Sequence, residues 1–411
     1  MNIGFISTRL AGTDGVSLET AKIAAIMRRL GHEVFYCAGE LEPDGPPGLL
    51  VPEMHFTYLA ARRIHDEAFT GSAPDDLRAR ITTQAAALQQ RIAEFVEQFS
   101  IDVLFPQNAL AIPMHIPLGV ALTDFIAETG IPTLAHHHDL YWERARFAHC
   151  AVPDVLERAF PPALPSIHHL VINSLAQAAL RQRKGLEASL LPNIFDFATP
   201  PSPPDEFVAD MRPALGLEPD ARIILQPTRV IPRKGIEMAI ELVQRLGDPR
   251  DRLVITHHAG DEGVAYLRQL QTLAAQSGVD LRYVADRFAP TRASTAAGVK
   301  TYSLWDAYPQ ADFVTYPSLI EGFGNAFLEA VYFRCPLLVN RYPVYTADIG
   351  PLGFRCVGID GALTDEAVEE VRRLLADAAL REEVTVHNYA VAQAYFSYEA
   401  VTPLLAGLLA A

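Results

Sequence analysis

The sequence predicts an α/β protein of two domains, each built on a parallel, doubly wound sheet. The chain has 411 residues, more than one hydrophobic core usually serves, so two domains of about 200 residues are expected. Short apolar strands alternate with helices in both halves, which is typical of parallel sheets covered by helices. The segment Ala198–Pro204 separates the two alternating stretches, because it is rich in proline and lacks periodicity.

The first half, residues 1–197, begins as strand, loop and helix. Ile3–Ser7 is the strand and Arg9–Gly15 the loop. The helix covers Ser17–Leu30, since Ser17 suits an N-cap and Gly31 a helix stop. Asp76–Phe99 has the pattern of a long amphipathic helix. Further strands are expected at His32–Cys37, Val103–Phe105, Thr133–His136 and Leu170–Asn173.

The second half, residues 198–387, repeats the alternation. Two such domains predict a central cleft, because ligands of open α/β sheets bind at the carboxyl ends of the strands. The last residues, 388–411, are expected to be helical, either as a core helix or as a strap that returns to the first domain. The expected strands are Ile223–Gln226, Leu253–His257, Leu281–Val284, Asp312–Tyr316 and Pro336–Asn340, and the expected helices are Gly235–Leu246 and Ala326–Phe333.

Composition excludes several classes of function. The formal net charge of −15 argues against nucleic acid or an anionic membrane as the main partner, since both favour a basic surface. The four cysteines lie far apart without paired spacing, as expected of reduced thiols in a cytoplasmic protein. No apolar window is long enough for a membrane span, and the N-terminus lacks the pattern of a signal peptide.

The most specific stretch is Tyr316–Ala330, which is predicted to be a strand end, a glycine-bearing loop and the start of a helix. Backbone N–H groups and the positive dipole end at such a helix N-terminus suit a diphosphate. Glu321 in the loop and Glu329 in the helix cannot ligate phosphate, but carboxylates accept hydrogen bonds from hydroxyl groups, which sugars supply. Together these features indicate a sugar nucleotide as the ligand.

A basic cluster, Arg229, Arg233 and Lys234, follows a strand and precedes a helix. An arginine fork and a lysine point charge suit the neutralisation of a diphosphate. A solvated basic loop is the alternative for this cluster taken alone, and the pair Glu321 and Glu329 favours the binding interpretation.

Three consecutive histidines close a strand of the first half and precede Asp139. In an extended backbone His136 and His138 share one face and His137 the other. One functional histidine beside two hydrogen-bonded or exposed ones is favoured over a metal site with Asp139, because no second cluster has ligand spacing. No metal site is therefore assigned.

Two further features are weaker. In the loop that contains Gly12 and Gly15, glycine lets the backbone approach a ligand closely, although a plain connecting turn is equally compatible. Its match to the dinucleotide fingerprint is incomplete. His257 and His258 are interpreted as structural or as lining a base pocket.

Together these residues resemble the retaining glycosyltransferases of family 4 (glycosyl transferases group 1), which have the GT-B fold of two Rossmann-like domains facing a central cleft. The resemblance covers essentially the whole chain, including the glycine loop, the His-Asp-Leu at His138–Leu140, the Leu-Pro-Asn at Leu191–Asn193 and the Arg229–Gly235 element. Its most specific part is Pro317–Ala330, which is similar to the family motif of two glutamates separated by seven residues.

The resemblance implies a role for each site residue. Arg229 and Lys234 would hold the donor diphosphate and stabilise the leaving nucleotide. Glu321 would bond hydroxyls of the transferred sugar, and Glu329 would bond the ribose. His138 matches the histidine that contacts the sugar near the reacting carbon. The backbone of Gly322, Phe323, Gly324 and Asn325 would lie close to sugar and phosphate, and Gly15 would let the first-domain loop approach donor and acceptor.

The implied activity is transfer of a hexose, of glucose or mannose type, from a UDP-, GDP- or ADP-hexose to a hydroxyl acceptor. Retention by a front-face mechanism is implied, with no enzymatic nucleophile, no permanently bound cofactor and no divalent metal. A GT-B-fold sugar-nucleotide epimerase and a non-catalytic nucleotide-sugar-binding protein are the alternatives. The order of the motifs and the intact set Arg229, Lys234, Glu321 and Glu329 favour transfer. The donor base, the sugar, the acceptor and the oligomeric state are left open.

Departures from the family pattern concern the acceptor region and the motif helix. Tyr141–Arg144 contains an aromatic pair and an arginine, which could stack a sugar and hold a carboxylate or phosphate, or could form a packed aromatic loop. Tyr332–Pro336 replaces the Ala-Cys-Gly that often precedes the proline, and Asn325 stands where leucine is common. The Asp76–Phe99 helix is not strongly basic, unlike that of membrane-associated relatives, so a soluble acceptor is expected.

Overall fold

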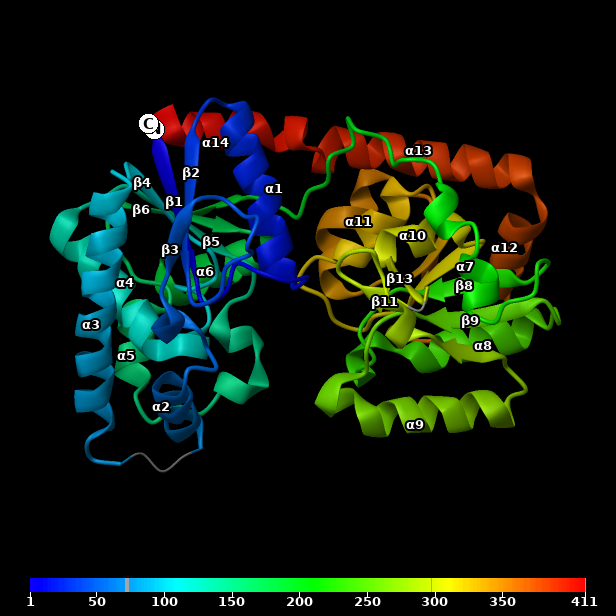
Figure 1. Ribbon diagram of the computed structural model, residues 1–411, viewed down its shortest axis with the longest axis horizontal. Helices are drawn as coiled ribbons and strands as arrows, with labels where there is room; N and C mark the ends of the chain where they lie inside the picture. Colours follow the sequence, from blue (N-terminus) through cyan, green and yellow to red (C-terminus); the bar gives the residue numbers. More distant parts are fainter. Residues whose placement is uncertain (71–73, 297, 411) are drawn as a thin grey trace. The chain divides into compact units, whose positions relative to one another are not determined.

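The computed structural model describes residues 1–70, 74–296 and 298–410, which form two units (Figure 1). Unit 1 contains Met1–Asn193 and the end of the chain from Thr402, and unit 2 contains Ile194–Val401. The contacts divide the chain at residue 193, a few residues before the boundary predicted at residue 197. The reason is that the linker is fastened within unit 2: the Tyr389 hydroxyl donates to the Phe197 carbonyl oxygen at 2.7 Å.

Unit 1 is built on a seven-stranded sheet in the order β3-β2-β1-β4-β5-β6-β7, and its paired strands are parallel. The order reverses between β1 and β4, so the loops after these two strands leave the sheet in opposite directions, where ligands of such sheets bind. The strands are β1 (Asn2–Ser7), β2 (Glu33–Ala38), β3 (Gly48–Leu50), β4 (Val103–Pro106), β5 (Thr133–His137), β6 (Ile167–Val171) and β7 (Ala188–Leu190).

The helices of unit 1 include α3 and α4, which pack side by side (Figure 1). Apolar positions of α3 at helical spacing, such as Leu88, Ile92 and Phe95, are buried in the core. The long helix predicted at residues 76–99 is therefore confirmed. The helices are α1 (Gly15–Arg29), α2 (Leu59–Phe69), α3 (Leu77–Gln98), α4 (Ile116–Thr129), α5 (Pro153–Ala159) and α6 (Ser174–Lys184).

Two predicted boundaries in unit 1 are wrong because an unexpected side chain caps the helix. Helix α1 begins at Gly15, since Asp14 accepts from the backbone N–H groups of Val16 and Ser17 at 3.1 and 3.2 Å. Strand β6 ends at Val171, before Asn173, whose side chain accepts from the N–H of Ala176 at 2.7 Å and caps α6.

Unit 2 has a six-stranded sheet in the order β10-β9-β8-β14-β15-β16, again with parallel pairs, and its order reverses between β8 and β14. The predicted doubly wound architecture is therefore confirmed in both units. A small three-stranded sheet of order β11-β13-β12 was not predicted. The strands are β8 (Arg222–Gln226), β9 (Asp251–Ile255), β10 (Leu281–Tyr283), β11 (Phe288–Ala289), β12 (Ala293–Ser294), β13 (Lys300–Ser303), β14 (Phe313–Tyr316), β15 (Leu337–Asn340) and β16 (Val357–Ile359).

The C-terminal region consists of two helices, not the single one expected. Ser397 has an extended backbone between them, and its neighbour Phe396 accepts through its carbonyl oxygen from the N–H of Phe195 at 2.8 Å. Among the described helices, none combines the length and the apolarity that a bilayer span requires. The helices from residue 194 onward are α7 (Met211–Ala214), α8 (Ile236–Leu246), α9 (Gly260–Gln276), α10 (Leu304–Ala307), α11 (Asn325–Tyr332), α12 (Asp365–Ala376), α13 (Ala378–Phe396) and α14 (Tyr398–Ala410).

Candidate active site

In unit 2 the loops after β8 and β14 lie against each other, because these two strands are paired neighbours. The N–H of Leu319 donates to the Arg233 carbonyl oxygen at 2.8 Å. Gly235 has a φ of +60°, and an added Cβ would lie 2.5 Å from the Pro317 carbonyl oxygen. Only glycine suits this position, which holds the preceding lysine against the second loop.

Lys234 and Glu321 form a buried ion pair at this junction. The Lys234 Nζ contacts Glu321 Oε1, and each side chain is only 9% exposed. Arg233 Nη1 lies 3.2 Å from Glu321 Oε2 and donates to the Ile320 carbonyl oxygen at 2.8 Å. The structure thus brings together Lys234 and Glu321, both predicted site residues, and it adds Arg233, which was predicted only as a member of the basic cluster.

The electrostatic balance of this cluster is positive. Burial lowers the pKa of Lys234, as do the charges of Arg233 and Arg229, while Glu321 opposes them. Burial by itself raises the pKa of Glu321, but Lys234 and Arg233 outweigh it, so the pKa is lowered. His257, after β9, has its pKa lowered to about 4 by burial and by Lys234 and Arg229. A neutral histidine and three cations against one carboxylate suit a dianionic ligand.

The glycine loop leads directly into α11, which begins at Asn325 without a side-chain cap in the described structure. Gly324 has a φ of +124°, and an added Cβ would lie 2.7 Å from Tyr342 Oη and 2.9 Å from Tyr316 Oη. The Phe323 ring is buried against Phe396, with ring centroids 5.2 Å apart. At residues 322–325 the backbone is therefore the part suited to face a ligand, and the N-terminus of α11 favours an anion.

Glu329 lies inside α11 and is buried. The Tyr308 hydroxyl donates to Glu329 Oε2 at 2.8 Å, and burial together with this carboxylate raises the pKa of Tyr308 well above its usual value. Tyr308 itself stacks on Phe333 with ring centroids 5.1 Å apart. Tyr308 thus orients the second glutamate of the motif, a role with no signal in the sequence.

In unit 1 the loop after β1 is held by acidic side chains. Asp14 caps α1 and also pairs with Arg9, whose Nη2 lies 3.0 Å from Asp14 Oδ2. The N–H of Gly12 donates to Glu42 Oε1. Gly15 is the first residue of α1. The predicted ligand-facing glycine therefore lies at a helix N-terminus whose first N–H groups are partly taken by Asp14.

The predicted alternation of the histidines is confirmed. The rings of His136 and His138 lie with centroids 4.2 Å apart, whereas His137 Nε2 lies 2.9 Å from His169 Nδ1. Burial lowers the pKa of His138 to about 3 and holds the pKa of His136 and His137 well below the usual value. These histidines are therefore neutral near pH 7.

Two residues after β4, for which the sequence predicted no role, position the end of β5. Asn108 has a φ of +58°, and its Oδ1 accepts from the N–H groups of His138 and Asp139 at 3.0 and 3.3 Å. Gln107 contacts both His136 and His138 through its side-chain amide, at 3.1 Å each. Within the part of the chain that the structure describes, no group of three or more His, Cys, Asp or Glu residues is placed to hold a metal ion.

The loop after β5 continues as a short aromatic segment. Arg144 Nη2 lies 2.6 Å from Asp139 Oδ2, and the Arg144 and Asp139 side chains are 40% and 25% exposed. Arg183 lies over the Trp142 ring at 5.5 Å, and Tyr141 contacts that ring edge to face. Trp142 is thus packed within unit 1, while Arg144 remains partly accessible.

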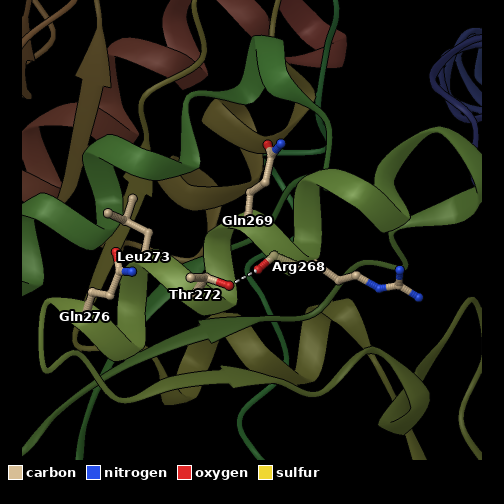
Figure 2. A pocket seen from close by; sticks show the side chains of 5 residues that line it. All are labelled: Arg268, Gln269, Thr272, Leu273 and Gln276. Carbon is tan, nitrogen blue, oxygen red and sulfur yellow. Dashed lines mark hydrogen bonds between the residues drawn. The ribbon is translucent and has the colours of Figure 1, made fainter.

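Two hollows in the surface lie away from these residues. One, of about 330 Å³, lies along α9. Its lining side chains all come from that helix (Figure 2). They are Arg268, Gln269, Thr272, Leu273 and Gln276. The other, of about 520 Å³, is lined by residues 163–165, 167–169 and 186–189 near the amino ends of β6 and β7. Neither hollow includes a predicted site residue.

Comparison with known proteins places the chain in a family. No family model matches the sequence. The chain is 31% identical over 379 residues to the mannosylglucosylglycerate synthase of Petrotoga mobilis, covering 87% of this chain and 86% of the relative. It is 31% identical over 440 residues to the mannosylglucosylglycerate synthase of Thermotoga maritima, covering 98% and 99%. The chain is a family 4 glycosyltransferase.

Solved structures agree with this assignment at the level of the fold. The glycosyltransferase superposes on Anabaena HepE in complex with UDP-glucose with a TM-score of 0.67, 15% identity and coverage of 100% and 99% of the two chains. For the sucrose-phosphate synthase of Thermosynechococcus elongatus the TM-score is 0.66, with 16% identity and coverage of 100% and 98%. The solved structures show the GT-B fold, and the relatives of 31% identity make the enzyme a hexosyltransferase.

Proposed function

We propose that the enzyme transfers a mannosyl group from a nucleoside-diphosphate mannose to a hydroxyl group of glucosylglycerate, with retention of anomeric configuration. The relatives that match the chain over most of its length are named for the corresponding product. HepE, which shares the fold, binds UDP-glucose. The acceptor carries a carboxylate, so an anionic acceptor distinguishes this proposal from transfer to a neutral sugar or a lipid.

The observation that supports the proposal most strongly is the cluster of Arg229, Arg233, Lys234 and Glu321 beside the N-terminus of α11. In the reaction the bond between C1 of the sugar and the diphosphate oxygen breaks, and negative charge develops on the diphosphate. Lys234 and Arg229 would stabilise that charge, together with backbone N–H groups at the start of α11. Lys234 is held by Glu321 before the donor binds, and a charge positioned in advance stabilises the leaving group most effectively.

The transferred sugar would be held by acceptors of hydrogen bonds. Glu321, with one oxygen on Lys234 and the other near Arg233, would accept from sugar hydroxyls. Glu329, oriented by Tyr308, would accept from the ribose hydroxyls. His138 in unit 1 would contact the transferred sugar, and Gly15 would let its loop approach the substrates.

The second half of the step forms the bond between the acceptor oxygen and C1 on the same face. The acceptor proton would pass to an oxygen of the departing phosphate, so neither Glu321 nor Asp139 acts as a covalent nucleophile. The cationic side chains would neutralise the diphosphate without a divalent metal ion.

Purified enzyme should be incubated with GDP-, UDP- and ADP-mannose and -glucose, each with glucosylglycerate, glucose or glycerate. The proposal predicts release of the nucleoside diphosphate with glucosylglycerate and a mannosyl donor, at a rate unchanged by EDTA. A product with inverted anomeric configuration would contradict retention, and loss of activity with EDTA that zinc or magnesium restores would contradict metal independence. Conversion of the donor to an epimer without any acceptor would contradict transfer itself.

A further inference from the structure

Gln107 is buried at the carboxyl edge of the unit 1 sheet, where its side-chain amide contacts the rings of His136 and His138. One terminal atom of its amide is 3.1 Å from His136 Nδ1 and equally 3.1 Å from His138 Nε2. His136 Nε2 is 3.3 Å from the Leu191 carbonyl oxygen. The other terminal atom of the Gln107 amide has no partner among the described residues.

The two ends of an amide are nearly indistinguishable by shape and are assigned from the hydrogen-bond network. Both histidines are neutral near pH 7, because burial lowers their pKa. A neutral imidazole carries one N–H donor and one acceptor nitrogen. The number of protons available to this cluster is therefore fixed.

If the Gln107 oxygen faces the rings, His136 has an acceptor at both nitrogens, namely that oxygen and the Leu191 carbonyl oxygen. One N–H cannot serve both contacts, so two lone pairs would face each other. The amide NH₂ group would in addition keep two donors without a described partner, which is a costly arrangement for a buried group.

If the Gln107 nitrogen faces the rings, each contact is satisfied. Its two N–H groups donate to His136 Nδ1 and His138 Nε2, and His136 Nε2–H donates to Leu191. The atom without a partner is then a carbonyl oxygen, which is tolerated better than an unpaired donor. His138 must accept at Nε2, so its proton is on Nδ1.

We propose that Gln107 is a positioning residue that holds His138 as the Nδ1–H tautomer, which makes His138 a hydrogen-bond donor and not a base in the transfer reaction. This inference rests on the proposed contact of His138 with the transferred sugar. Asn108 fixes the backbone of His138, and His138 Nδ1 has no partner among the described residues. A neutral donor can bond a sugar oxygen without placing a positive charge beside the cationic carbon that develops at C1.

The test is nitrogen-15 NMR of the enzyme with labelled histidine rings at pH 7, without substrates. The His138 signal is assigned by its loss in His138→Asn. We expect an Nδ1–H tautomer in the wild type. In Gln107→Glu a carboxylate can only accept, so His138 should become the Nε2–H tautomer or an imidazolium. The value of kcat should then fall about tenfold or more, as for loss of one positioned donor, with the donor KM little changed.

Gln271→Glu, an exposed residue of α9, is the matched control and should change neither quantity. An Nε2–H tautomer in the wild type would overturn the inference, and this measurement does not depend on whether a variant folds. A Gln107→Glu enzyme that folds, keeps the Nδ1–H tautomer and loses no activity would overturn it as well. An Nδ1–H tautomer in a protein inactive with every donor would refute the proposed function instead.

Discussion

Replacing the buried ion pair between Lys234 and Glu321 should change folding stability and transfer activity in different ways: the double variant should regain stability but not activity. Both side chains are 9% exposed, and removing one partner of a buried pair leaves an uncompensated charge, which typically costs about 3–5 kcal/mol. Arg233 retains a contact with Glu321 at 3.2 Å, but its side chain is 36% exposed, so solvent screens this contact and it contributes about 1 kcal/mol or less.

We therefore expect Lys234→Met to destabilise unit 2 by about 3 kcal/mol, the lower end of the range, and Glu321→Leu to do the same. For a unit of this size the melting temperature should fall by about 6–12 °C. The double variant removes both charges, so it should recover at least about 2 kcal/mol of the summed loss. All three variants should lose transfer activity by about a hundredfold or more, because both side chains are proposed to contact the donor.

Differential scanning calorimetry measures the stabilities, and release of nucleoside diphosphate measures the activity. The exposed pair of Arg341 and Asp360, 2.6 Å apart, supplies the control: Arg341→Met should cost less than about 1 kcal/mol and leave transfer intact. The reasoning would be refuted if the stability lost in the double variant equalled the sum of the losses in the two single variants. A double variant that transfers sugar normally would refute it as well.

Three further results are expected. Gly235→Ala should lower both the melting temperature and kcat more than Gly247→Ala does. Both glycines have positive φ, but an added Cβ would lie 2.5 Å from the Pro317 carbonyl oxygen at Gly235 and 3.9 Å from the Gln244 carbonyl oxygen at Gly247. Equal losses in calorimetry would contradict this. Tyr308→Phe should lower the free energy of unfolding by about 1–3 kcal/mol and raise the donor KM, because the buried Glu329 loses a hydrogen bond. An unchanged KM would contradict the proposal that Tyr308 orients Glu329. The stability of unit 1 should fall as the pH drops below 6.5, because His138, with a pKa of about 3, stays neutral when folded but binds a proton when unfolded. Urea unfolding at pH 7 and 5.5 should show a free energy of unfolding that falls by up to about 1.4 kcal/mol per pH unit because of this residue. In His138→Gln this contribution to the pH dependence should be absent. The same pH dependence in the variant and the wild type would be inconsistent with a neutral His138.

The alternation of strands and helices was predictable because each element carries its own periodicity, as the buried stripe of α3 illustrates. The strands β11 and β12 of the small sheet were missed because each has only two residues, too few for a period. The start of α1 was predicted too late in the sequence because Asp14 and Ser17 are both good N-caps. In the structure Asp14 is the cap, and it accepts hydrogen bonds from Ser17 itself.

The identities of the candidate site residues could be predicted from the sequence, but the residues that they contact could not. Lys234 and Glu321 were singled out as donor ligands, yet their ion pair depends on β8 and β14 being neighbours, which is a property of the strand order. Contacts such as Tyr308 with Glu329, or Gln107 with His138, likewise join residues whose separation in sequence has no helical or strand period. Such partners become visible only when the sheet order is known.

The most direct test of the account is calorimetric titration of the nucleoside diphosphate, GDP or UDP, into the wild type and two single variants of unit 2. Lys234→Met removes a cation of the proposed donor site, whereas Arg268→Met removes an exposed cation of the hollow on α9 (Figure 2). We expect the affinity to fall about tenfold or more in Lys234→Met, as for loss of a charge-assisted bond, and to be unchanged in Arg268→Met. Full affinity in a folded Lys234→Met variant, or weakening by Arg268→Met alone, would contradict the central claim that the loops after β8 and β14 bind the donor diphosphate.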